Sequence, residues 1–158
     1  ILPLSTLYWL GMIALSCRRI VVRKIGVIFF TVYFLHMELT VSYTRLEELV
    51  AHLSEAPNTI AFGDVISLID NTFFFTPTAF ENGVIKNQEN HNNGSCKLLA
   101  LGQYLDLSNE QTLALFGSFY RDDVLNHPEG DDHGNIRNFM QTGHAGVTFE
   151  QFPLVLKG

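Results

Sequence analysis

Residues 95–128, SCKLLALGQYLDLSNEQTLALFGSFYRDDVLNHP, decide the expected fold, because they read as two amphipathic helices in succession. Ser95 is placed to cap the first helix. Ser108 and Gln111 form a capping box that starts the second helix, and Pro128 ends it. Apolar residues recur at helical spacing, which predicts two buried stripes: Leu98, Leu101 and Leu105 in the first helix, and Leu113, Phe116, Tyr120 and Val124 in the second.

The sequence before this stretch predicts two further helices. Thr44 to Glu47 read as a capping box, and the helix that follows should end ahead of Pro57. The segment FGDVISLIDNTFFF (62–75) repeats the apolar spacing, and Thr76-Pro77 should end its helix. Together with the two central helices, these segments indicate a helical core.

The remaining segments predict one more helix and a small β element. A last helix should begin at Asp131 or Asp132, end at Gly143 and carry Ile136, Phe139 and Met140. Asn82-Gly83 is a two-residue turn signal typical of a β-hairpin, and GVTFEQF (146–152) can form a final strand. The expected fold is therefore mainly α (α+β), a compact bundle of about five helices with a small β-hairpin element.

Composition indicates a folded domain with an acidic body. The chain has 158 residues, of which 47% are hydrophobic and 16% charged, as expected of a globular protein rather than a disordered one. Its net charge is −6, yet residues 1–36 hold four basic residues and no acid. The acidic remainder argues against nucleic acid as a partner. Two cysteines, Cys17 and Cys96, do not predict a disulfide framework.

Residues 1–36 differ from the rest of the chain. Seventeen uncharged residues precede the basic cluster of Arg18, Arg19, Arg23 and Lys24, and a second apolar run follows it. The first run is close to the minimum of about 17 residues for a membrane-spanning helix. Two interpretations stay open: an extension upstream of the domain, or a membrane segment. We expect the globular domain to comprise residues 37–158.

Three stretches resemble the HopJ family of type III effectors: FTPTAFENG (75–83), residues 92–130, which include the opening stretch, and DHGNIRNFMQTG (132–143). The resemblance extends over about residues 40–152. It implies synthesis in the bacterial cytoplasm and secretion into a host cell by a type III system. It also implies an unknown protein partner or host target, while the molecular activity that the family name covers stays undefined.

Cys96 is the first candidate for chemistry. A position in the first helical turn, beside Lys97, would lower the pKa of its thiol, and His127 or His133 could act as base with Asp132 orienting the imidazole. The alternative is that the thiol is buried in the core and that Ser95 simply caps the helix. Asn93, Ser95 and Lys97 could also contact an anion at the helix start.

The segment YRDDVLNHPEGDDHGNIRNF (120–139) gathers acids, histidines and arginines. His127, Asp131, Asp132 and His133 could hold a transition metal, or the two acids could stabilise the start of the last helix. Arg121 and Arg137, flanked by Tyr120 and Asn135, could bind an anionic ligand. The favoured alternative is an Arg–carboxylate network that joins the two helices.

These alternatives lead to two hypotheses. The first is a HopJ-like protein of unknown molecular activity that acts as a small interaction domain, with no cofactor. The second is a small hydrolase or metal-binding protein that uses Cys96 with His127 and His133. If a site exists, we expect it at the joint between residues 120 and 139 together with the helix start at Ser95-Cys96.

Overall fold

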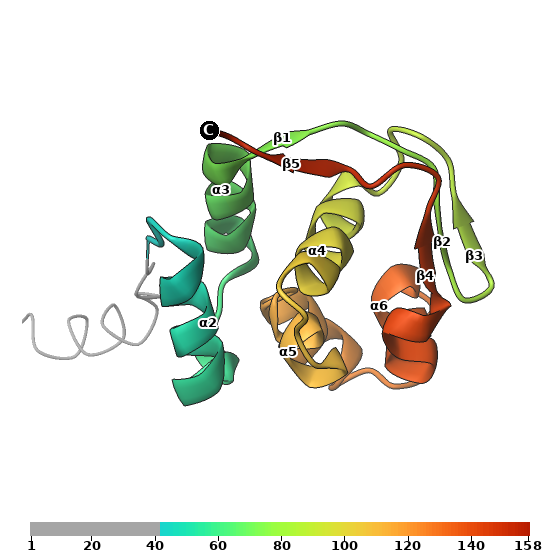
Figure 1. Cartoon of the computed structure of the whole chain (residues 1–158). Coiled ribbons are helices and arrows are strands. Elements are labelled where there is room, and N and C mark those ends of the chain that lie inside the picture. Colours follow the sequence, from blue (N-terminus) through green and yellow to red (C-terminus); the bar gives the residue numbers. More distant parts are fainter. Residues whose placement is uncertain (1–41) are drawn as a thin grey trace, which may run out of the picture. The chain divides into compact units, whose positions relative to one another are not determined.

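The computed structural model describes residues 42–158, in which two α-helices are followed by three very short strands, then by three α-helices and two further strands (Figure 1). Its five α-helices are α2 (Leu46–Glu55), α3 (Phe62–Thr72), α4 (Asn93–Tyr104), α5 (Asn109–Ala114) and α6 (Gly134–Thr142). Two 3₁₀ turns, Pro57–Thr59 and Gly143–Gly146, and a π-helix, Phe119–Val124, complete the helical part. The mainly helical α+β class expected from the sequence is confirmed.

Five strands form two small antiparallel sheets. They are β1 (Phe73–Phe75), β2 (Phe80–Asn82), β3 (Ile85–Asn87), β4 (Val147–Phe149) and β5 (Leu154–Leu156). β1 pairs with β5, and the second sheet has the order β3-β2-β4. The final segment of the chain thus joins both sheets: it lies first beside β2 and then beside β1, which are far from it in sequence (Figure 1).

The core is built around α4. Leu98, Leu99 and Leu101 of this helix are fully buried, and the buried residues of α3, α5 and α6 complete the same cluster. More of α4 is buried than the single stripe expected from the sequence, because Cys96, Leu99 and Ala100 also lie in the core. Among residues 42–158, every helix is too short or too polar to span a bilayer.

The expected hairpin is present, but its turn lies one residue later. β2 and β3 pair with Asn82 opposite Ile85, so the turn residues are Gly83 and Val84. Gly83 has φ of +58°, a conformation that glycine adopts without steric cost. The strand expected near residues 146–152 is confirmed as β4, whereas β5 was not predicted.

Helix starts differ from the predictions at three places. Thr44 donates to Glu48, not Glu47, so the first capping box is wrong in its partner. α4 begins at Asn93, which puts Ser95 inside the first turn instead of at the cap. α6 begins at Gly134, because His133 takes a left-handed conformation before it. The capping box of Ser108 and Gln111 is confirmed.

Two predicted helices are interrupted. The helix of residues 62–75 ends at Thr72, and Phe73–Phe75 form a strand that pairs with β5. The helix expected from Ser108 to Pro128 breaks at Gly117, whose φ is +59°, and resumes as the π-helix. Met140 of α6 is half exposed instead of buried. The boundary at residues 36 and 37 lies outside the described residues and stays a prediction.

Candidate functional site

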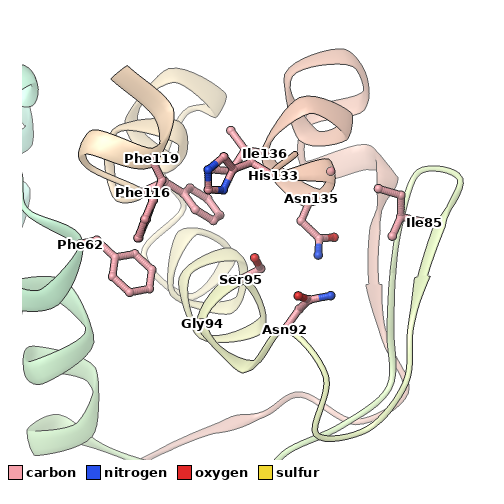
Figure 2. A pocket seen from close by; sticks show the side chains of 11 residues that line it. Phe62, Ile85, Asn92, Gly94, Ser95, Phe116, Phe119, His133, Asn135 and Ile136 are labelled. Atoms are coloured by element: carbon pink, nitrogen blue, oxygen red, sulfur yellow. The ribbon is translucent and has the colours of Figure 1, made fainter. Parts of the chain in front are cut away.

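A pocket of about 410 Å³ opens between the start of α4 and the start of α6 (Figure 2). Parts of α3, β3 and the π-helix complete its walls. We call it the α4–α6 pocket. Its lining has an apolar group, Phe62, Ile85, Phe116, Phe119 and Ile136, a polar group, Asn92, Ser95, His133 and Asn135, and two glycines, Gly94 and Gly134.

The two kinds of side chain occupy different sides of the pocket. Figure 2 shows the rings of Phe62, Phe116 and Phe119 together on one side and the amides of Asn92 and Asn135 on the other. Phe62 and Phe119 meet edge to face, with their centroids 5.0 Å apart. An aromatic wall therefore faces an amide wall, and Ser95 lies between them (Figure 2).

His133 is held from two directions. Its Nε2 lies 3.0 Å from Oδ2 of Asp123 in the π-helix and 3.8 Å from Oδ2 of Asp132. Its ring packs against the ring of Phe119, with 5.3 Å between the centroids. Because a carboxylate only accepts hydrogen bonds, Nε2 carries the proton. In the neutral form, Nδ1 is then an acceptor.

Asn135 is held by a largely buried asparagine network, which we define as Asn82, Asn87, Asn92 and Asn135; of these four, Asn92 alone is exposed. Nδ2 of Asn135 donates to Oδ1 of Asn87 at 2.9 Å, and Oδ1 of Asn135 accepts from both Asn82 and Asn87. Asn92 donates its own Nδ2 to Oδ1 of Asn87 at 2.7 Å. The network therefore connects the hairpin, α6 and the start of α4, and it fixes two polar residues of the pocket.

Ser95 offers a hydroxyl to the pocket. Serines in helices commonly donate to the carbonyl four residues earlier, as Ser54 and Ser67 do here. Among residues 42–158, Ser95 Oγ has no such partner. The glycines bring the walls close, since a Cβ at Gly94 would lie 3.0 Å from Phe62 Cζ.

Cys96 is next to Ser95 but belongs to the core. It is fully buried and does not line the pocket. Burial raises the pKa of its thiol to about 11, against the opposing effects of the Thr78 backbone and Lys97. The expected lowering of this pKa is wrong, because loss of water outweighs the helix start and the nearby cation. This environment disfavours a thiolate nucleophile, and a catalytic role for Cys96 stays a prediction.

His127 and His133 are separated by the loop between them. His127 is exposed and does not line the pocket, while His133 does. Within residues 42–158, no group of three or more His, Cys, Asp or Glu side chains is placed to hold a metal ion. The acids at 131 and 132 also precede the start of α6 instead of lying in its first turn. The loop leaves His127 outside the pocket, while Asp132 Oδ2 lies 3.8 Å from Nε2 of His133.

The two arginines have different roles. Arg137 binds the loop before its helix through Asp132 Oδ1 at 2.7 Å, Asp132 O at 2.8 Å and Pro128 O at 3.3 Å. This pairing holds the pKa of Asp132 below its usual range. Arg121 donates instead to the carbonyl of Ile60 at 2.8 Å. The predicted Arg–carboxylate network is therefore right for Arg137 and wrong for Arg121, and the link between the π-helix and α6 is His133 with Asp123.

Three other predicted binding residues lie outside the pocket lining. Lys97 pairs with Asp70 and lies over the ring of Phe75, away from the pocket. Tyr120 packs against the core, and Asn93 lies at the start of α4 outside the pocket lining. Of the predicted site residues, the pocket brings together Ser95, His133 and Asn135.

Several pocket residues could not be recognised in the sequence. Phe62 and Ile85 come from segments that read as core and hairpin, and nothing in the sequence pairs them with residues after 90. Asp123 belongs to the segment 120–139, whose acids were expected to pair with arginines and not with His133. Asn92 precedes the helix start expected at Ser95, and Gly94 between them is a weak signal of a site where groups approach the backbone closely.

The protein is thus a small, mainly helical α+β domain. Its α4–α6 pocket has an aromatic wall on one side and an amide wall on the other. The chain belongs to the family described as HopJ type III effector protein, whose model matches residues 46–154. It is also similar to a solved protein titled "Crystal structure of unknown function protein VPA0580", with 47% identity and a TM-score of 0.71. That match covers 72% of this chain and 95% of the other. No curated protein matches the sequence.

Proposed function

We propose that this HopJ-family protein acts as a small interaction domain and that the α4–α6 pocket receives part of its protein partner or host target. The observation that carries this proposal is the pocket itself, where rings from two helical elements face amides fixed by the asparagine network. Pockets of this size, with apolar walls and a few placed polar groups, are typical of binding sites.

Rigidity supports binding as the role of the site. His133 is held by Asp123 and Phe119, and Asn135 makes its hydrogen bonds inside the domain. Side chains that are already fixed lose little conformational entropy when a ligand arrives, and this raises affinity.

Charge limits the class of partner. All 16 acidic residues of the chain follow residue 36, and six of the ten basic residues do. Lys97 and Arg137, two of those six, are paired with Asp70 and Asp132. Nucleic acid would meet a repulsive surface, because phosphate binding requires a surplus of Lys and Arg. A protein partner without acidic groups where it contacts the pocket fits this distribution.

A fragment screen with matched variants tests the binding role. Ser95→Phe places a ring in the pocket, and Ser67→Phe adds the same ring to the exposed face of α3 as a control. By ligand-observed NMR with the full chain, small molecules that bind the natural protein should lose binding to Ser95→Phe and keep it with Ser67→Phe. Equal binding to both variants would place the ligands elsewhere and contradict the proposal.

We also propose delivery as the family description implies, from the bacterial cytoplasm into a host cell. A reporter enzyme that is active only in host cytoplasm, fused to the end of the full chain, tests this. Signal should appear with an intact type III secretion system and disappear in a bacterium that lacks one. Signal of equal strength in both bacteria would exclude type III delivery. Membrane attachment through residues 1–36 stays a prediction.

A further inference from the structure

The α4–α6 pocket has properties that select one kind of contact, and this inference rests on the binding function proposed above. We propose that the pocket receives the side chain of a tryptophan or tyrosine of the partner protein. The ring would lie against Phe62 and Phe119, and its N–H or O–H would donate to Asn92.

The aromatic wall selects a ring. Phe119 is 38% exposed, a large exposure for a phenylalanine, and it lies in the pocket beside Phe62 and His133. Pairs of aromatic rings gain about 0.5–1.5 kcal/mol beyond the burial of apolar area. A ring that enters here meets two other rings at once, whereas an aliphatic side chain would gain burial alone.

The amide wall selects a hydrogen-bond donor on that ring. Asn92 uses Nδ2 to hold Asn87, which leaves Oδ1 as the free end of its amide. Within residues 42–158, that oxygen accepts no hydrogen bond. Indole and phenol carry a donor at one edge of an apolar ring, and they are the side chains that place a polar tip opposite an apolar body.

Charge at the rim selects a neutral ring. No Lys or Arg lines the pocket, and the carboxylates of Asp123 and Asp132 lie beside His133. An anionic ligand would meet these carboxylates without a counter-ion. A cation would meet the first-turn amides of α4 and α6, whose N–H groups carry partial positive charge. A neutral ring avoids both costs.

Amino-acid amides test the inference against the full chain. N-acetyl-tryptophanamide and N-acetyl-tyrosinamide should bind about 2- to 10-fold more tightly than N-acetyl-leucinamide, the range that a ring–ring gain gives. N-acetyl-phenylalaninamide, which lacks the ring donor, should be intermediate. Amides of aspartate and arginine should bind most weakly. Ligand-observed NMR titration measures all six affinities.

Matched variants assign the binding to the two walls. Asn92→Gly keeps the left-handed backbone of residue 92 and removes the acceptor, and Asn90→Gly makes the same change at an exposed neighbour with φ of +64°. The advantage of tryptophan over phenylalanine should vanish in Asn92→Gly and persist in Asn90→Gly. Phe119→Leu should weaken the aromatic amides, while Phe74→Leu, at an exposed ring on β1, should not.

The outcomes separate this inference from the binding function on which it rests. If the leucine, aspartate or arginine amide binds best, and the Ser95→Phe variant abolishes that binding, the aromatic anchor is overturned and the pocket remains a binding site. The proposal of an aromatic anchor is also overturned if both Asn92→Gly and Phe119→Leu leave the affinities of the aromatic amides unchanged. If none of the six amides binds, both proposals fail.

Discussion

The Nε2 atom of His133 lies 3.0 Å from Oδ2 of Asp123, and this contact joins the π-helix to the start of α6 at the wall of the pocket. Both side chains are partly exposed. Exposed pairs of this kind contribute little to stability, about 0–1 kcal/mol. The main consequence of the contact is therefore the fixed position of the imidazole.

Replacing Asp123 should affect binding more than stability. We expect Asp123→Ala to lower the free energy of unfolding by less than about 1 kcal/mol in urea titrations. Ligand affinity should fall more clearly, because the imidazole loses its hydrogen bond and its fixed position. Asp122→Ala, at the exposed neighbouring residue, is the control. Equal affinities for the two variants would show that His133 needs no carboxylate.

The asparagine network should contribute strongly to stability. Asn87→Ala removes hydrogen bonds to Asn135 and Asn92 and leaves Nδ2 of the buried Asn135 without its partner. Unsatisfied buried amides cost about 1–3 kcal/mol, and we expect a loss of that size in the free energy of unfolding. Gln88→Ala, at the exposed residue that follows, should change it little. A loss no greater than that of the control would mean that water replaces the network without cost.

Cys96 should be unreactive in the folded protein. Its thiol is buried and its pKa is raised to about 11, so the thiolate is rare at neutral pH. We expect iodoacetamide to modify Cys96 at pH 7 only at the rate of unfolding, so that urea accelerates the reaction. Mass spectrometry after digestion separates Cys96 from Cys17. Rapid modification of Cys96 in the folded protein would contradict this prediction and support Cys96 as a nucleophile.

Stability should fall at alkaline pH. Burial raises the pKa of Cys96 from 9.0 to about 11, and burial together with Asp64 raises that of Tyr43 from 10.0 to about 12. Folding favours the protonated form of each group, so their stabilisation is complete below the unfolded pKa values. It is lost as pH rises through about 9–11 for Cys96 and about 10–12 for Tyr43. Urea unfolding at each pH measures it, and Tyr43→Phe should flatten the upper part of the curve. An equally steep curve in Tyr43→Phe would contradict the assignment.

The fold was predictable where local signals agree with tertiary structure. The capping box at Ser108 and the turn signal near Gly83 gave correct elements, because the residues that specify them are adjacent in sequence. The break at Gly117 was not predictable, since the apolar spacing continues across it from Leu113 to Val124. A Cβ at Gly117 would lie 2.7 Å from the backbone nitrogen of Phe62, so a contact with a distant segment explains the glycine.

The site was predictable in place but not in composition. The start of α4 and the joint before α6 were expected to form any site, and the pocket lies between them. Cys96 was the candidate nucleophile, with His127 or His133 as its base and Asp132 orienting the imidazole. The structure places Asp123 closer to the imidazole and turns Cys96 into the core. Which carboxylate lies close to His133, and whether Ser95 or Cys96 faces the pocket, depends on the residues at which the helices start. The observed starts differ from the predicted ones by one to three residues.

A titration that observes His133 directly is the sharpest test of the pocket as the binding site. The full chain, labelled with ¹⁵N only in its histidines, gives ring signals that single His→Gln variants can assign. On addition of N-acetyl-tryptophanamide, or of a ligand from the fragment screen, the His133 signals should shift to saturation while those of His91 and His127, which lie outside the pocket lining, stay in place. Shifts at His91 or His127 with an unchanged His133 would contradict the account.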